Sequence, residues 1–221
     1  MNRLAGLSLI FGPVIAFVFF LIEPGGLLID SAKVSDAVGS ISAKSSNETL
    51  TNVTNIAIIL GLALILSGLY ALMRNVTLEG NGKALVQMGF FMTLVGLTGW
   101  ILSGGIDFIL ADAQTSDEIR GSVPVYYAGS ALVYAGGITL GFGSLIFALG
   151  LSTRDDFNQT ISLLAALVSL AIMVFFIMAV LSNADRDTFI GMARGCYVLL
   201  VIWYGYLGVG LMNRPDPDLW R

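Results

Sequence analysis

The sequence contains no histidine and a single cysteine, Cys196. Histidine is the side chain most used for proton transfer and metal ligation near neutral pH. Haem, copper and zinc sites depend on imidazole or thiolate ligands, and one cysteine can form neither a thiolate cluster nor an internal disulfide. We therefore expect no metal centre, no cofactor and no catalytic residue, and we predict that the chain is not an enzyme.

Charged residues are also scarce. They make up only 12% of the chain, about half the share of roughly 25% that is usual in soluble domains, which excludes a soluble enzyme. The 11 Lys and Arg residues are outnumbered by 15 Asp and Glu residues. They form no basic stripe that would neutralise phosphates, so nucleic acid is excluded as a partner. The lysines, Lys33, Lys44 and Lys83, all fall in predicted loops, which argues against a retinal site within a helix.

Long uncharged runs dominate the rest of the chain. Six stretches of 19 to 33 residues contain no charged side chain. About 20 helical residues cross a hydrocarbon core about 30 Å thick, and inside lipid such runs satisfy their backbone hydrogen bonds as helices. We predict an all-α integral membrane protein with one domain over residues 1–221. Its six transmembrane helices are expected near residues 4–22, 53–73, 85–108, 124–150, 160–182 and 190–212.

The first of these runs has an alternative interpretation as a secretory signal, because Arg3 precedes it. The apolar region of a signal peptide usually spans about 7–15 residues and ends at a small-residue cleavage site. Here 19 uncharged residues lead into Glu23-Pro24-Gly25-Gly26, without a convincing cleavage pattern. We therefore interpret the run as a retained helix.

Six spans place both chain termini on one side of the membrane. If that side is the cytoplasm, the inner loops are short, at Arg74–Lys83 and Ser152–Asn158. These loops and the tails hold six Lys and Arg residues, whereas the longer outer segments hold five, together with most of the acidic residues. Following the positive-inside rule, we predict cytoplasmic N- and C-termini. We expect the plasma membrane as the location.

The first outer loop, residues 23–50, carries an amphipathic pattern. Its apolar residues fall mostly on one helical face, and Asp30 would serve as the N-cap of a helix that began there. We predict a short amphipathic helix that lies on the membrane surface or caps the bundle. A re-entrant segment is the alternative, but it would carry Lys33, Asp36 and Lys44 into lipid.

Small residues are unevenly distributed among the predicted spans. They allow helix backbones to approach closely where lipid supplies no hydrophobic drive between helices. The fifth span contains no glycine, so we expect it at the periphery of the bundle. The alternative is that these glycines line a path for a solute. The residues that we predict to mediate helix packing are Gly136, Gly137, Gly141, Ser144, Gly191 and Gly195.

Two charged residues adjoin apolar runs on the predicted outer side. Asp107 follows the uncharged run of the third span, and Arg194 lies early in the sixth. Ionisable groups at membrane depth are costly and by default mark functional sites. We therefore predict that Asp107 and Arg194 form an ion pair or a solute site. The alternatives are an aspartate that merely marks a helix end and an arginine that snorkels to the interface.

Aromatic residues occur near both predicted interfaces. Tyr126 and Tyr127 open the fourth span, and Trp203, Tyr204 and Tyr206 occupy the inner half of the sixth. Aromatic belts at the two interfaces are typical of membrane proteins, so we predict that these side chains are interfacial anchors. A substrate cage at Trp203–Tyr206 is the alternative.

Two functions remain compatible with these features. The one we favour is a non-catalytic accessory or structural subunit that packs against lipid and against other membrane proteins or copies of itself, because no charge is expected near the midplane. The second is a small transporter or channel for a small solute or a proton. The glycine-rich helices and the Asp107–Arg194 pair support this alternative.

Overall fold

The computed structural model describes residues 2–77, 81–182 and 184–214. The described residues form helices and no strand. Six of the helices are long and apolar enough to cross a membrane, and these are all except α2 and α5. The predicted all-α fold with six transmembrane helices is therefore confirmed. The helices are α1 (Asn2–Ile22), α2 (Ala37–Ser46), α3 (Glu48–Thr77), α4 (Lys83–Ala111), α5 (Ser116–Gly121), α6 (Val123–Ser152), α7 (Gln159–Leu181) and α8 (Arg186–Met212).

Several of the long helices extend beyond the spans predicted for them. The clearest case is α3, which begins at Glu48 rather than near residue 53 and ends at Thr77 rather than near residue 73. Glu48 in the first turn and Arg74 in the last turn complement the helix dipole, so the helix continues through its polar ends. The short helix α5 was not predicted. It begins at a capping box between Thr115 and Glu118.

The six long helices form a closed ring. Each packs against two neighbours, in the order α1, α3, α4, α6, α7 and α8, and α8 packs against α1 to close the ring. This order is also the order of the chain, as expected for short connections between antiparallel helices. The helix α7 belongs to the ring and buries Ile172 and Phe176. It is no more peripheral than the other five, which corrects the expectation for the fifth span.

Glycines make close backbone contacts at several interfaces of the ring, but some glycines face open space. At the α4–α6 contact, a Cβ on Gly96 would lie 2.7 Å from the carbonyl oxygen of Gly136. On the α7 side of α6, a Cβ on Gly141 would lie 2.7 Å from the backbone nitrogen of Met173. Such separations require glycine. In contrast, Gly191 and Gly195 face open space, so their predicted packing role does not hold within the described chain.

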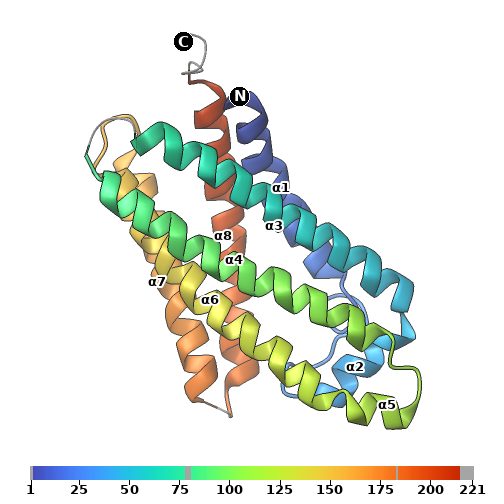
Figure 1. Cartoon of the computed structure of the whole chain (residues 1–221). Coiled ribbons are helices and arrows are strands. Elements are labelled where there is room, and N and C mark those ends of the chain that lie inside the picture. The colour runs from blue at the N-terminus through green and yellow to red at the C-terminus, as the bar shows by residue number, and fades with distance from the viewer. Residues whose placement is uncertain (1, 78–80, 183, 215–221) are drawn as a thin grey trace.

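The first and last described residues, Asn2 and Arg214, lie with the loop between α6 and α7 at one end of the ring, the terminal end (Figure 1). Asn2 donates a hydrogen bond to the carbonyl of Arg214. In the loop between α6 and α7, Arg154 donates to the carbonyl of Val76, at the end of α3, and Asp156 pairs with Arg214. The first and last described residues therefore lie on the same side of the ring, as six antiparallel spans require.

The helices α2 and α5 lie at the opposite end, the cap end (Figure 1). As predicted for the first outer loop, its helix is short, and it caps the bundle by packing against α3, α4 and α6. The predicted N-cap was wrong. Asp36 caps α2 through the backbone nitrogen of Gly39, whereas Asp30 has a φ of 44° and accepts a hydrogen bond from Asn47. The helix therefore begins later than its apolar pattern indicated.

Candidate functional site

The ring encloses a cavity of about 260 Å³ in its cap-end half. All six ring helices, α2 and the segment 23–34 contribute to its lining. Along α4, the lining extends from Leu110 at the cap end to Leu97 at the middle of the helix. Beyond that level, fully buried side chains fill the ring towards the terminal end, including Leu9, Leu69, Leu72, Phe147, Leu207 and Leu211.

Three charged side chains meet in the wall of this cavity. The Lys44 ammonium on α2 contacts Glu23 Oε1, just beyond α1, and lies 2.9 Å from Asp107 Oδ1 on α4. Glu23 and Lys44 are each only 8% exposed. Removing an ion from water costs several kcal/mol, which attraction between well-placed partners can offset. Each ion of the cluster is therefore stabilised by its partners and would be costly to leave unpaired.

The charge state of Lys44 follows from its two neighbours. Burial lowers the pKa of the Lys44 ammonium, but the carboxylates of Asp107 and Glu23 more than offset this effect. The pKa of Lys44 is therefore held above its ordinary value, and the side chain is a cation at neutral pH. Two carboxylates share this one cation, so the cluster carries a formal net charge of −1.

Local sequence explains why Lys44 faces inwards. Within α2, Ala37, Ile41 and Lys44 recur at steps of four and three residues and so share one helical face. Ala37 and Ile41 are buried against the ring. Packing this apolar face directs the Lys44 side chain into the bundle as well. Glu23 is placed by the turn after α1, in which Gly25 adopts a φ of +77° that favours glycine.

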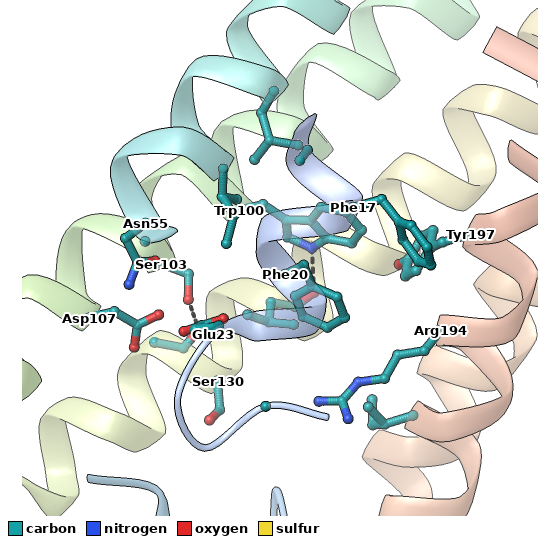
Figure 2. Close-up of a pocket in the computed structure, with 18 of the residues that line it drawn as sticks. Phe17, Phe20, Glu23, Asn55, Trp100, Ser103, Asp107, Ser130, Arg194 and Tyr197 are labelled. Carbon is teal, nitrogen blue, oxygen red and sulfur yellow. Dashed lines mark hydrogen bonds between the residues drawn. The ribbon is translucent and has the colours of Figure 1, made fainter. Parts of the chain in front are cut away.

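The predicted pair between Asp107 and Arg194 does not form. Asp107 pairs with Lys44, and the Arg194 guanidinium carbon lies 5.2 Å from the centre of the Phe20 ring, an attractive cation–π arrangement. The reason is the ring order, because α4 and α8 stand opposite each other across the ring. Both residues nevertheless line the same cavity, and Figure 2 shows Arg194 reaching into it from the side opposite Asp107.

Most other polar groups of the lining are already hydrogen-bonded. Ser103 donates to the carbonyl of Gly129, and the Trp100 indole donates to the carbonyl of Val133 (Figure 2). The hydroxyl of Tyr197 differs: it is buried and has no hydrogen-bond partner in the described part of the chain. The Tyr197 ring packs edge-on against Trp100 across the interior, with ring centres 5.0 Å apart.

The predicted aromatic anchors divide into two groups. Tyr127 is 48% exposed and Tyr206 is 36% exposed, as positions on the outer surface of the ring require. Tyr126, Trp203 and Tyr204 are buried inside the bundle, which corrects their assignment as interfacial anchors. Residues that are close together in a helix point in different directions, and an apolar sequence alone does not show which of them point into the bundle.

The buried tyrosines have specific partners. Tyr126 donates to the carbonyl of Val34 at 3.0 Å, which ties the outer loop to α6. The hydroxyls of Tyr204 and Ser144 lie 3.2 Å apart, between α8 and α6. Ser144, predicted as a packing residue, is thus a buried hydrogen-bonding contact between helices. A substrate cage at Trp203–Tyr206 would lie mostly outside the cavity, because Tyr204 alone among these residues lines it.

Sequence reasoning missed Lys44, Glu23 and Tyr197. The first two were assigned to a solvated loop, although the spacing of Lys44 from Ala37 and Ile41 was a usable signal. Among the described residues, no third carboxylate or thiolate lies close enough to Glu23 and Asp107 to complete a metal site. The cavity therefore offers ion pairing and hydrogen bonding to a ligand, in mostly apolar surroundings.

Comparison with known proteins yields no relative: no protein-family model, no curated protein and no solved structure matches the chain.

Proposed function

We propose that this membrane protein binds a small solute in the cavity of its helix ring and transports it. The observation that carries the proposal is the buried cluster of Lys44, Glu23 and Asp107 in the wall of that cavity. Ionisable groups inside a membrane bundle are costly and mark solute or ion pathways by default. The expectation of an accessory subunit assumed that such groups were missing from the interior.

The position of the cavity favours a transporter over an open channel. The cavity reaches from the cap end to the middle of the ring, and packed side chains close the remaining half. Carriers bind their substrates near the midplane and expose the site to one side at a time. Pro13 lines the cavity halfway along α1, where the missing backbone donor weakens the helix and provides a natural hinge. We further infer that the cap end faces outwards and the terminal end faces the cytoplasm.

Thiol accessibility tests whether the cavity admits solutes. In a Cys196→Ser background, Ser130→Cys places a thiol in the cavity lining, and Ser144→Cys places one on the same helix in the closed half. We expect a small cationic methanethiosulfonate to modify the thiol at position 130 in folded protein and to leave position 144 unmodified. Equal protection of both thiols would contradict a solute-binding cavity.

The accessory role remains a second candidate because of the outer face of α8. Gly191, Gly195 and Gly205 have open space where a Cβ would lie, in contrast to the glycines of α6. A second membrane protein could therefore approach the α8 backbone closely. Native mass measurement after gentle solubilisation tests this role. A stable heteromeric complex supports it, and a monomer contradicts it.

A further inference from the structure

The charges around the cavity form a dipole. On the side of α1 and α4, Glu23 and Asp107 share the single cation Lys44, which leaves a formal charge of −1. On the opposite side, Arg194 contributes +1 and makes no ion pair with any described residue. Figure 2 shows the two carboxylates and the guanidinium on opposing walls of the same pocket.

Each side of this dipole has unused bonding capacity. Lys44 occupies one oxygen of each carboxylate, Oε1 of Glu23 and Oδ1 of Asp107, and so leaves the second oxygen of each for another donor. Opposite them, the buried Tyr197 hydroxyl has no partner among the described residues. Tyr197 lies three residues after Arg194 on α8, so both donors project from one helical face. The α8 side can donate hydrogen bonds to a ligand, and the α1–α4 side can accept hydrogen bonds from a ligand.

The remaining lining sets the size and the apolar character of a ligand. Phe17, Phe20, Leu62, Leu97 and Trp100 surround the space between the charged walls. The volume of about 260 Å³ is less than twice the roughly 150 Å³ of a cavity that holds benzene. It suits a molecule of about ten to fifteen non-hydrogen atoms and is far too small for a two-chain lipid.

From this arrangement we propose that the cavity binds a small zwitterion with an apolar body, of the size of an apolar amino acid. Its ammonium group binds between Glu23 and Asp107, and its carboxylate binds to Arg194 and Tyr197. A zwitterion leaves the cavity electrically neutral, whereas an anion or a cation alone would add a net buried charge. This inference rests on the proposed solute-binding function and names the class of solute.

Three matched probes separate the two charges. L-phenylalanine carries both, 3-phenylpropanoate lacks the ammonium, and 2-phenylethylamine lacks the carboxylate. Binding to the full chain in nanodiscs is measured by calorimetry. We expect L-phenylalanine to bind at least about tenfold more tightly than either single-charge probe, because each lost charge leaves a buried group of the site unpaired.

Variants then assign each end of the ligand. Arg194→Gln should weaken L-phenylalanine binding by about tenfold or more and leave binding of 2-phenylethylamine nearly unchanged. Tyr197→Phe, which preserves shape, should weaken L-phenylalanine binding by about threefold to tenfold. Arg120→Gln, at an exposed arginine of α5, is the matched control and should bind like the wild type. If Arg194→Gln does not fold, Tyr197→Phe carries the same test.

The outcomes distinguish this inference from the proposed function. Equal binding of all three probes, or unchanged binding by both Arg194→Gln and Tyr197→Phe, overturns the zwitterion assignment and leaves solute binding intact. Failure of all three probes while the thiol at position 130 remains reactive also overturns only the assignment. Failure of all probes together with a protected thiol overturns both.

Discussion

The Lys44 ammonium on α2 lies 2.9 Å from the Asp107 carboxylate on α4, and it also contacts Glu23 at the end of α1. In the ring, α3 separates α1 from α4. One lysine of the cap therefore joins two helices that are not neighbours. Movement of α2 would separate charges that stabilise one another only in contact. The position of the cap and the electrostatics of the cavity are consequently coupled.

Lys44→Met should destabilise the protein more than Asp107→Asn. The first change leaves two buried carboxylates without their cation, whereas the second leaves the Lys44–Glu23 pair in place. Breaking a buried ion pair costs about 3–5 kcal/mol, and we expect Lys44→Met to approach this range. Thermal unfolding in nanodiscs measures the difference, with Lys33→Met at an exposed loop position as control. Equal losses for the two cluster variants would show that Lys44 does not hold the carboxylates together.

Asp107 and Arg194 should show little direct coupling. They occupy opposite sides of the ring, and Asp107 is already paired with Lys44. In a double-mutant cycle of Asp107→Asn and Arg194→Gln, we expect the effects on unfolding to add within about 0.5 kcal/mol. The cycle of Lys44→Met and Asp107→Asn should instead give a large coupling. A strong Asp107–Arg194 coupling would mean that the two side chains meet directly.

The sequence was informative about the spans and much less so about the interior. Uncharged runs predict six helices because a charge in lipid is costly. They do not show which helices face each other across the ring, since lipid and neighbouring helices are equally apolar environments. Asp107 and Arg194 were therefore recognised as notable but paired wrongly. Lys44 was assigned to solvent because it lies outside the runs, and only its place beside Ala37 and Ile41 indicated otherwise.

Leucine substitutions should separate the two classes of glycine. Gly141→Leu forces a side chain against the backbone of α7, where a Cβ would lie 2.7 Å from the Met173 nitrogen. Gly195→Leu projects into open space. We expect Gly141→Leu to destabilise the folded protein by about 1–3 kcal/mol or to prevent assembly. Gly195→Leu should melt within a few degrees of the wild type in detergent. Comparable losses would show that Gly195 also makes a helix contact.

Labelling of intact cells tests the orientation of the ring. In a Cys196→Ser background, Lys33→Cys exposes a thiol at the cap end and Asn81→Cys exposes one at the terminal end. With the cap end outside, a membrane-impermeant maleimide should label position 33 alone. Both thiols should react after the cells are permeabilised. Labelling at position 81 but not at position 33 would reverse the topology.

The terminal end should lose stability in acid through Asp156. This carboxylate lies 2.9 Å from Arg154 Nε and 2.8 Å from an Arg214 nitrogen. Burial raises the pKa of Asp156, but the hydrogen bond from Arg154 and the charges of Arg214 and Arg154 outweigh it, so the pKa lies below its ordinary value of 3.8. Because the carboxylate is more acidic in the folded state, its stabilisation is present above pH 3.8 and is lost as the pH falls through the folded-state pKa.

Comparison with Asp156→Asn isolates this contribution. The other carboxylates titrate in both proteins, so the difference in melting temperature between wild type and variant reports on Asp156. We expect the wild type to melt higher at pH 6 and the difference to shrink as the pH approaches 3. Asp155→Asn, at the exposed neighbouring carboxylate, is the matched control and should show no such convergence. A difference that stays constant down to pH 3 would mean that the ion pairs of Asp156 do not support the link between α8 and the α6–α7 loop.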